Sequence, residues 1–363
     1  MKQTHGNIQS NSPVLHPPGD YYPENSAAWF TIPDGNDTGK KMFYYDHVVG
    51  DSEPTATILF VHGNPETSYT YRKVISEMVN RKTRSYRIVA MDHIGFGLSD
   101  QASYEMVDMH HAHNLRRLIQ HQNLTDITLV IHDWGGPIGI GAMIRETDRL
   151  KNMVILNSTV FPIPLQGLTY ENFPLKWLSW SNFPKIVHPR FWGIHAAFSI
   201  NVQPKHPAKI VGEFIVFCFR ILTQQLPEKE RDAIILYKEQ FKSRKNAKSS
   251  MRMVRQTPVW GHGYVYDEPV LGKQDNREFY RYIQENITLL WGPSGKHIGV
   301  KALIGKWDPL AKSSVIEQWE DALPQLKGNV QLFGKTSHFI EEHRAPEIAD
   351  AIIDITALSR NDS

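Results

Sequence analysis

The sequence predicts an α/β protein in which a mostly parallel sheet, covered by helices on both faces, is interrupted by a mostly helical insertion. Short apolar runs rich in Val and Ile alternate with helix-like stretches up to residue 157. Such runs are typical of parallel strands buried on both faces. The alternation then stops for about a hundred residues rich in Trp, Phe and Pro, and it resumes near the C-terminus.

Eight strand-like segments and five helix-like segments follow one another along the chain. The predicted strands cover residues 28–32, 42–49, 58–61, 87–91, 127–131, 153–156, 300–304 and 330–333. The predicted helices cover residues 71–81, 105–122, 136–145, 315–323 and 346–358. Together they indicate one eight-stranded sheet. We expect a loosely ordered N-terminal tail (1–27), a first core part (28–160), a helical cap (161–258) and a second core part (259–363).

Composition excludes several classes of protein. Hydrophobic residues make up 41% and charged residues 21% of the 363 residues, and the formal net charge is +2. This charge gives no reason to expect a nucleic-acid or membrane partner. The single cysteine, Cys218, excludes an intramolecular disulfide, and its apolar surroundings predict a buried structural thiol. Residues 1–20 lack the apolar core of a signal peptide, and no run is long enough to span a bilayer, so we expect a cytoplasmic protein.

Polar clusters lie where four of the predicted strands end, as catalytic residues do in open α/β sheets. They begin at His62, His132, Trp307 and Ser337. The second cluster, His132-Asp133-Trp134-Gly135-Gly136, stands between a strand and a helix, which is the setting of a nucleophile elbow. Asp133 occupies the place where most such enzymes have Ser. Ile131 departs from the small residue of the strict pattern.

The order of three residues along the chain supports a catalytic triad. Nucleophile, acid and histidine follow one another in this fold, as Asp133, Asp308 and His338 do here. In the alternative interpretation Asp133 is a helix cap and His338 is an ordinary histidine. That alternative leaves unexplained why Asp308 and His338 both follow predicted strands.

Residues 62–68 (HGNPETS), residues 92–100 (DHIGFGLSD) and the Asp133 elbow resemble those of haloalkane dehalogenases. The resemblance covers the order of elements over residues 28–358 and is weak through the cap. It implies the α/β-hydrolase fold and hydrolysis of a carbon–halide bond without a cofactor or metal. It also implies that the Asn64 amide and the Trp134 indole bind halide and that their backbone N–H groups form an oxyanion hole. No carboxylate is present at Asn157 or Ser158, so the acid is Asp308, as in a third branch of that family.

The mechanism expected from this resemblance has two steps. Asp133 displaces halide from carbon and forms an alkyl ester, and water activated by His338 then hydrolyses the ester. The expected partners are a small halogenated hydrocarbon, water and halide. An oligomer is possible but cannot be derived from the sequence.

Three other functions remain open on this fold. An epoxide hydrolase would use cap tyrosines, for which Tyr170, Tyr237, Tyr264 and Tyr266 are candidates. A coelenterazine-type luciferase could keep the same triad, and a ligand receptor would need no catalysis. Asn64 beside Trp134 favours a dehalogenase over an epoxide hydrolase.

Other conspicuous residues have simpler interpretations. His110, His111 and His113 fall on a predicted helix, where neighbours do not share a face, so we predict no metal site there. The basic stretch 242–248 is interpreted as a solvated surface of the cap. Several aromatic residues are expected to line or support the pocket: Trp177, Trp180, Phe183, Phe191 and Trp192. One of the three tryptophans could contact halide.

Overall fold

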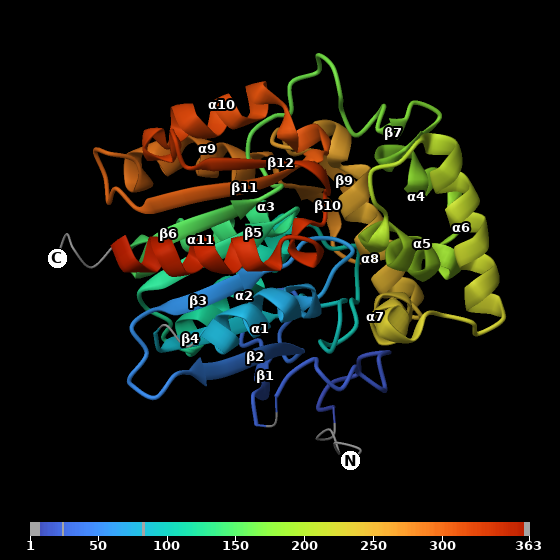
Figure 1. Ribbon diagram of the computed structural model, residues 1–363, viewed down its shortest axis with the longest axis horizontal. Coiled ribbons are helices and arrows are strands. Elements are labelled where there is room, and N and C mark those ends of the chain that lie inside the picture. Colours follow the sequence, from blue (N-terminus) through green and yellow to red (C-terminus); the bar gives the residue numbers. More distant parts are fainter. Residues whose placement is uncertain (1–7, 24, 82–83, 359–363) are drawn as a thin grey trace.

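The computed structural model describes residues 8–23, 25–81 and 84–358 and contains the predicted eight-stranded sheet (Figure 1). The strand order is β1-β2-β4-β3-β5-β6-β11-β12. β2 pairs antiparallel with both β1 and β4, and the other pairings in the sheet are parallel. The strands are β1 (Ala27–Thr31), β2 (Lys41–Val49), β3 (Thr57–Val61), β4 (Tyr86–Met91), β5 (Ile127–His132), β6 (Leu150–Leu156), β11 (Gly299–Trp307) and β12 (Val330–Ser337). Each lies where the sequence predicted a strand.

Helices cover both faces of the sheet, which explains why the central strands β3, β5 and β6 are buried almost throughout. α1 (Arg72–Arg81) packs on α11 (Ala345–Leu358), whereas α2 (Asp108–His121) packs on α3 (Gly135–Met143). Successive strand side chains alternate between the two resulting cores, with Leu59 in one and Phe60 in the other. α10 (Ser313–Ala322) was also predicted. α9 (Arg277–Trp291) and the hairpin of β9 (Val265–Glu268) and β10 (Gly272–Asp275) were not.

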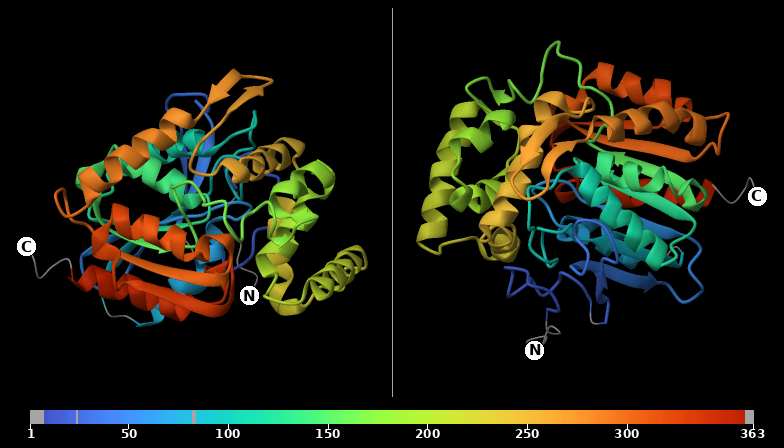
Figure 2. Two further views of the ribbon diagram at one scale, coloured as in Figure 1. Left: turned by 90° about the horizontal axis from the view of Figure 1, so that it is seen from above. Right: turned by 180° about the vertical axis from the view of Figure 1, so that it is seen from behind.

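A helical insertion, residues 161–258, follows β6 and lies beyond one end of the sheet (Figures 1 and 2). Its elements are β7 (Pro174–Leu175), β8 (Leu178–Ser179), α4 (Phe183–Ile186), α5 (Trp192–Asn201), α6 (Pro207–Leu222), α7 (Glu228–Glu239) and α8 (Arg244–Arg255). Cys218 lies on α6 and is half-buried, so the prediction of a buried thiol was wrong. None of the helices in the described part of the chain is long and apolar enough to cross a membrane.

The N-terminal segment is packed on the core, contrary to the expected loose order, although residues 1–7 lie outside the described part. Val14, Tyr21 and Tyr22 are buried, because this polar stretch carries apolar and aromatic side chains that the core accepts. The Tyr21 hydroxyl donates to Asp92 Oδ2 at 2.7 Å. Asp92 also accepts hydrogen bonds from the backbone N–H groups of Ser68 and Leu98, so this residue of the 92–100 motif joins three segments. Both of its carboxylate oxygens are occupied by these structural hydrogen bonds.

Candidate active site

The turn between β5 and α3 is a sharp elbow with Asp133 at its tip. Asp133 has φ 48°, a left-handed conformation that is uncommon for a non-glycine residue and typical of strained functional sites. Small residues make the turn possible. A Cβ on Gly135 would lie 2.1 Å from the Val61 carbonyl oxygen, and one on Gly136 would lie 1.9 Å from Ser158 Oγ. The Ser158 hydroxyl also donates to the Asp133 carbonyl at 2.6 Å, which fixes the elbow from β6.

Ile131 fits at the position where the strict elbow pattern has a small residue because a glycine faces it. A Cβ on Gly139 would lie 2.9 Å from Ile131 Cγ2. The larger side chain of Ile131 on the strand is therefore accommodated because Gly139 on the following helix has no side chain. The departure seen in the sequence does not distort the turn.

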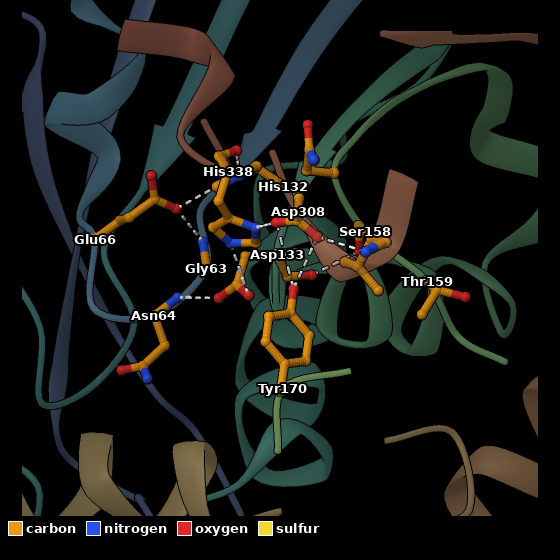
Figure 3. Close-up of polar contacts among 12 residues, drawn as sticks. Gly63, Asn64, Glu66, His132, Asp133, Ser158, Thr159, Tyr170, Asp308 and His338 are labelled. Carbon is orange, nitrogen blue, oxygen red and sulfur yellow. Dashed lines mark hydrogen bonds and ion pairs between the residues drawn. The ribbon is translucent and has the colours of Figure 1, made fainter. Parts of the chain in front are cut away.

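The three predicted triad residues come together at the ends of β5, β11 and β12 (Figure 3). Asp133 Oδ1 lies 3.2 Å from His338 Nε2, and His338 Nδ1 makes a hydrogen bond to Asp308 Oδ2. The Asn64 backbone N–H donates to Asp133 Oδ2 at 2.8 Å. All three triad side chains are buried. The distance between Asp133 and His338 is short enough for direct contact, and no cation other than His338 forms an ion pair with Asp133 among the described residues.

The charges of the triad determine the protonation of its histidine. Burial alone would lower the pKa of His338, but the carboxylates of Asp308 and Asp133 outweigh it and raise this pKa well above its usual value. Part of this effect comes from the Asp133 carboxylate, whose charge a covalent step would neutralise. The basicity of His338 is therefore coupled to the charge on Asp133.

Asp308 is held by contacts that the sequence did not predict. The Tyr170 hydroxyl donates to Asp308 Oδ1 at 3.2 Å, and its ring lines the same cavity as the triad. Asn157 accepts the Gly305 N–H at 2.7 Å and donates to the Gly305 carbonyl at 3.0 Å. Asn157 thus joins β6 to β11 three residues before the acid. Asn157, at the alternative position of the acid, therefore holds the two strands together.

The two predicted halide donors differ in their surroundings. Trp134 is buried and stacks on Trp260 with ring centroids 3.8 Å apart. No acceptor for its indole N–H is present in the described part of the chain. The Asn64 amide, by contrast, is paired with Ser250 of α8: the Ser250 hydroxyl donates to Asn64 Oδ1, and Asn64 Nδ2 lies 3.3 Å from the Ser250 carbonyl. The Trp192 indole donates to the same hydroxyl at 2.8 Å.

A cavity of about 30 Å³ lies over Asp133 and His338, and both the core and the insertion contribute to its mostly apolar wall. This volume holds about two water molecules. The lining side chains are Asn64, Pro65, Asp133, Trp134, Tyr170, Trp180, Trp192, His195, Val254, Thr257, Trp260, His338 and Phe339. A larger surface groove between α1, α7 and the N-terminal segment contains none of the triad.

The predictions for the aromatic residues were correct in part. Trp180 and Trp192 line the cavity, and Phe183 supports it by packing on Trp180. Trp177 and Phe191 are 71% and 61% exposed, so their assignment to the pocket was wrong. Short-range hydrophobicity identified these rings as apolar but could not determine which side of the insertion they occupy.

His195 is a cavity residue that the sequence gave no signal for. Its ring lies on α5 between aromatic neighbours, 4.1 Å from Phe183 and 4.9 Å from Trp192 between centroids. Burial lowers the pKa of His195 to about 3, so the imidazole is neutral. Its buried Nε2 has no hydrogen-bond partner among the described residues.

A second buried polar cluster lies behind the elbow. His132 Nε2 lies 2.9 Å from the His338 carbonyl, which can only accept, so this nitrogen carries a hydrogen. His132 Nδ1 and Glu66 Oε2, 2.7 Å apart, then share one proton. The Thr70 hydroxyl lies 3.0 Å from oxygens of both Glu66 and Glu341 and has one hydrogen to give. One carboxyl group must therefore be protonated.

The protonation states agree with this count. Burial and then the neighbouring Glu66 raise the pKa of Glu341 well above its usual value, and burial raises the pKa of Glu66 to about 7. Ligand atoms of Glu66, His132 and Glu341 lie within 4.8 Å of one another, as in a metal site, but shared protons account for most of their contacts. The cluster fixes the backbone of His338. Sequence reasoning missed it because its three members are far apart in the chain.

The residues set aside at first do not form a site. His110 contacts Gln274, and His113 contacts Asp34 on the surface. The basic residues Lys242, Arg244, Lys245 and Lys248 are exposed, as expected of a solvated surface. Of the four tyrosines considered for an epoxide, Tyr170 alone is among the residues that line the cavity.

Comparison with known proteins supports the fold and shows partial sequence similarity to several enzymes. Residues 56–193 match the family described as alpha/beta hydrolase fold. A cis-3-alkyl-4-alkyloxetan-2-one decarboxylase of Xanthomonas campestris is 37% identical over 135 residues, which are 35% of this chain and 43% of that protein. A haloalkane dehalogenase of Mycolicibacterium smegmatis is 30% identical over 192 residues, which are 52% of this chain and 54% of that protein. The chain thus aligns with about half the length of these relatives.

Solved structures resemble the whole chain. Haloalkane dehalogenase DpaA from Paraglaciecola agarilytica NO2 has a TM-score of 0.59 at 21% identity, with 91% of this chain and 92% of that chain covered. DBJA (mutant dbja delta) has a TM-score of 0.63 at 17% identity, with 92% and 99% covered. At these identities the likeness establishes the fold. The chain therefore has the α/β-hydrolase fold, and about half of its length is similar in sequence to a haloalkane dehalogenase.

Proposed function

We propose that the chain hydrolyses small haloalkanes to alcohol and halide through an ester on Asp133. The observation that carries this proposal is the contact between the Asp133 carboxylate, at a strained elbow, and His338 Nε2 at 3.2 Å, beneath an apolar cavity with an unpaired indole N–H. A carboxylate suits displacement at saturated carbon. A hydroxyl nucleophile would suit acyl transfer instead.

In the first step, Asp133 Oδ attacks the carbon that bears the halogen, and halide leaves with the bonding electron pair. The Asn64 N–H holds the other carboxylate oxygen and so aims the nucleophile. The Trp134 indole N–H stabilises the departing halide in a cavity from which most water is excluded. The Asn64 side chain contributes a second donor when its bond to Ser250 lengthens or is shared.

In the second step, His338 takes a proton from water, and the resulting hydroxide attacks the ester carbonyl. Esterification removes the negative charge of Asp133 and with it part of what raises the pKa of His338. The histidine can therefore lose its proton when a base is needed. Asp308 stabilises the imidazolium that forms. The N–H groups of Asn64 and Trp134 are the candidate donors for the oxyanion.

An epoxide hydrolase is less well supported, because that reaction needs a free hydroxyl to protonate the alkoxide. The hydroxyl of Tyr170 donates to Asp308, the Tyr237 hydroxyl lies near Glu342, and the Tyr266 hydroxyl donates to a backbone carbonyl. The Tyr264 hydroxyl has no hydrogen-bond partner among the described residues, but Tyr264 does not line the cavity. Light emission with coelenterazine would reveal a luciferase. An assembled triad gives no reason to expect a receptor.

A second candidate function is decarboxylation of a β-lactone. Two relatives, from Xanthomonas campestris and Shewanella oneidensis, are called cis-3-alkyl-4-alkyloxetan-2-one decarboxylases, and each is 37% identical to this chain over the aligned part. Attack of Asp133 on the ring carbon that bears oxygen would displace the ring carboxylate, as it displaces halide. Loss of carbon dioxide would then form the alkene and expel the Asp133 carboxylate. The pairing of Asn64 with Ser250, which leaves one free indole donor for halide, also favours a leaving group other than halide.

The test offers the purified chain 1-bromobutane, 1-chlorobutane, styrene oxide and a cis-3,4-dialkyl oxetan-2-one in parallel. The proposal predicts halide and butanol. Diol from styrene oxide alone, or alkene and carbon dioxide from the lactone alone, would replace it with the corresponding alternative.

The covalent step is tested with His338→Phe under single-turnover conditions. This variant should release one equivalent of halide and gain the mass of one butyl group, because the ester forms but is not hydrolysed. Asp133→Asn is the matched control and should gain no mass. Halide release without alkylated protein would exclude the ester.

A further inference from the structure

Helix α6 of the insertion has an apolar surface on the outside of the molecule. Ile215, Phe219 and Leu222 are 64%, 61% and 79% exposed, and their spacing of four and three residues places them on one face. Val216 borders this face and is 49% exposed. Figures 1 and 2 show α6 at the outer edge of the insertion, away from the sheet. We call these four residues the α6 face.

The opposite side of α6 is also apolar. Phe214 and Phe217 pack on Phe198 of α5, with ring centroids 5.0 and 5.5 Å apart. Its charged residues, Lys209, Glu213 and Arg220, occupy one narrow strip. A helix that is apolar on nearly every side is normally covered on every side. Among the described residues, nothing covers the α6 face.

The insertion is also strongly basic. Residues 161–258 contain 15 Lys and Arg residues and 6 Asp and Glu residues, a formal charge of +9. The rest of the chain contains 25 basic and 32 acidic residues, a formal charge of −7. The net charge of +2 is therefore the difference between two oppositely charged regions, and it conceals the attraction of one of them for anions.

We propose that the α6 face docks the chain on an anionic lipid surface. A helix with exposed Phe, Leu and Ile side chains can insert them among lipid acyl chains, while basic residues beside it attract anionic headgroups. Lys209 and Arg220 lie three helical turns apart on the strip next to the α6 face and are both exposed. Glu213, between them, is paired with Lys205.

A second copy of the chain is a less suitable occupant. One 16-residue helix is about 24 Å long, and two such helices bury less than the area of about 1,200 Å² that a stable interface needs. Two insertions of charge +9 would also repel each other. A lipid surface has neither limitation, since its headgroups supply the opposite charge.

Docking through α6 would bring the candidate active site close to the lipid. α5 packs on α6 through Phe198 and carries Trp192 and His195, which line the cavity. Apolar substrates that dissolve in the bilayer would then be concentrated beside the insertion. Docking itself does not depend on which reaction Asp133 performs.

The test is flotation of the full chain with vesicles of phosphatidylcholine alone or with about 30 mol % phosphatidylglycerol. Wild-type protein should float with the anionic vesicles, and raising the salt from 0.1 to 1 M should weaken binding as the Debye length falls from about 10 to 3 Å. The double variant Phe219→Ser/Leu222→Ser should bind at least about tenfold more weakly. Leu289→Ser is the matched control, because Leu289 is equally exposed (67%) but lies on α9 of the core.

Three results would overturn the proposal. The first is no flotation of the wild type, and the second is flotation unaffected by the double variant. The third is a dimer in sedimentation that the double variant converts to a monomer, which would assign the α6 face to a second copy. Unchanged halide release from a water-soluble substrate, or unchanged thermal unfolding, would show that the double variant remains folded.

Discussion

The core and the insertion contribute different things to the same cavity. The core supplies the candidate reacting groups, Asp133, Asp308 and His338, each at the end of a strand and each fixed by hydrogen bonds. The insertion supplies walls such as Trp180, Trp192 and His195, and one polar link through Ser250. The core has a formal charge of −7 and the insertion +9. The candidate reacting groups are therefore positioned by the sheet, and the insertion determines much of the shape and polarity of the space above them.

The largest effect should come from removing the nucleophile. Asp133→Ala should lower kcat by at least about 10⁴-fold, because no neighbouring carboxylate can reach the same position. Halide release, measured with an ion-selective electrode, provides the readout. Thermal unfolding should show that the variant remains folded, since Ala, like Asp, keeps a Cβ at φ 48° and the backbone of the elbow need not change. Activity near that of the wild type would show that Asp133 is not the nucleophile.

A smaller but selective effect is expected in the insertion at His195. Its unpaired Nε2 can bond an oxygen of a substrate, and the rest of the wall is mostly apolar. His195→Phe should lower kcat/KM for 3-bromo-1-propanol about tenfold, which is the value of one buried hydrogen bond, and leave that for 1-bromobutane within about twofold. An equal loss for both substrates would mean that His195 has only a packing role.

The link between the two regions should have a still smaller effect. Ser250→Ala removes the hydroxyl that donates to Asn64 Oδ1 and accepts from the Trp192 indole, but keeps the carbonyl bonded to Asn64 Nδ2. The amide can then turn more freely and the Trp192 N–H loses its acceptor, so halide should bind more tightly, by about threefold to tenfold. Quenching of tryptophan fluorescence by bromide measures this affinity. Ser249→Ala, one residue earlier on α8, is a control that does not touch Asn64. Weaker halide binding in Ser250→Ala would mean that Ser250 positions the amide for halide.

The stability of the core, unlike the preceding effects on activity and binding, should depend on pH through His93. Burial lowers the pKa of His93 from 6.5 to about 4, so the folded state binds fewer protons than the unfolded state between these values. Stability therefore falls as pH falls through this window, by up to about 3 kcal/mol from His93 alone. Urea unfolding of wild type and His93→Gln at pH 7 and pH 4.5 measures the difference. If the pKa of His93 is not lowered in the folded state, wild type and His93→Gln should lose the same free energy of unfolding between pH 7 and pH 4.5.

Local sequence patterns predicted most of the core because its strands are short, buried and apolar. All eight strands and the order Asp133, Asp308, His338 were derived from patterns of this kind. α9 was missed although its apolar residues recur with helical spacing. The hairpin before it is polar and half-exposed, and strands of that kind have no distinctive pattern.

The sequence by itself determined the sheet, the elbow and the identity of the three candidate catalytic side chains, because each depends on residues within a few positions of one strand. Only the tertiary structure decided that Ser250 occupies the Asn64 amide and that Phe191 and Trp177 face outward. It also decided that Glu66 shares a proton with His132 and, through Thr70, lies beside Glu341. Such contacts join segments up to 275 residues apart. Their partners are selected by packing, which no local pattern encodes.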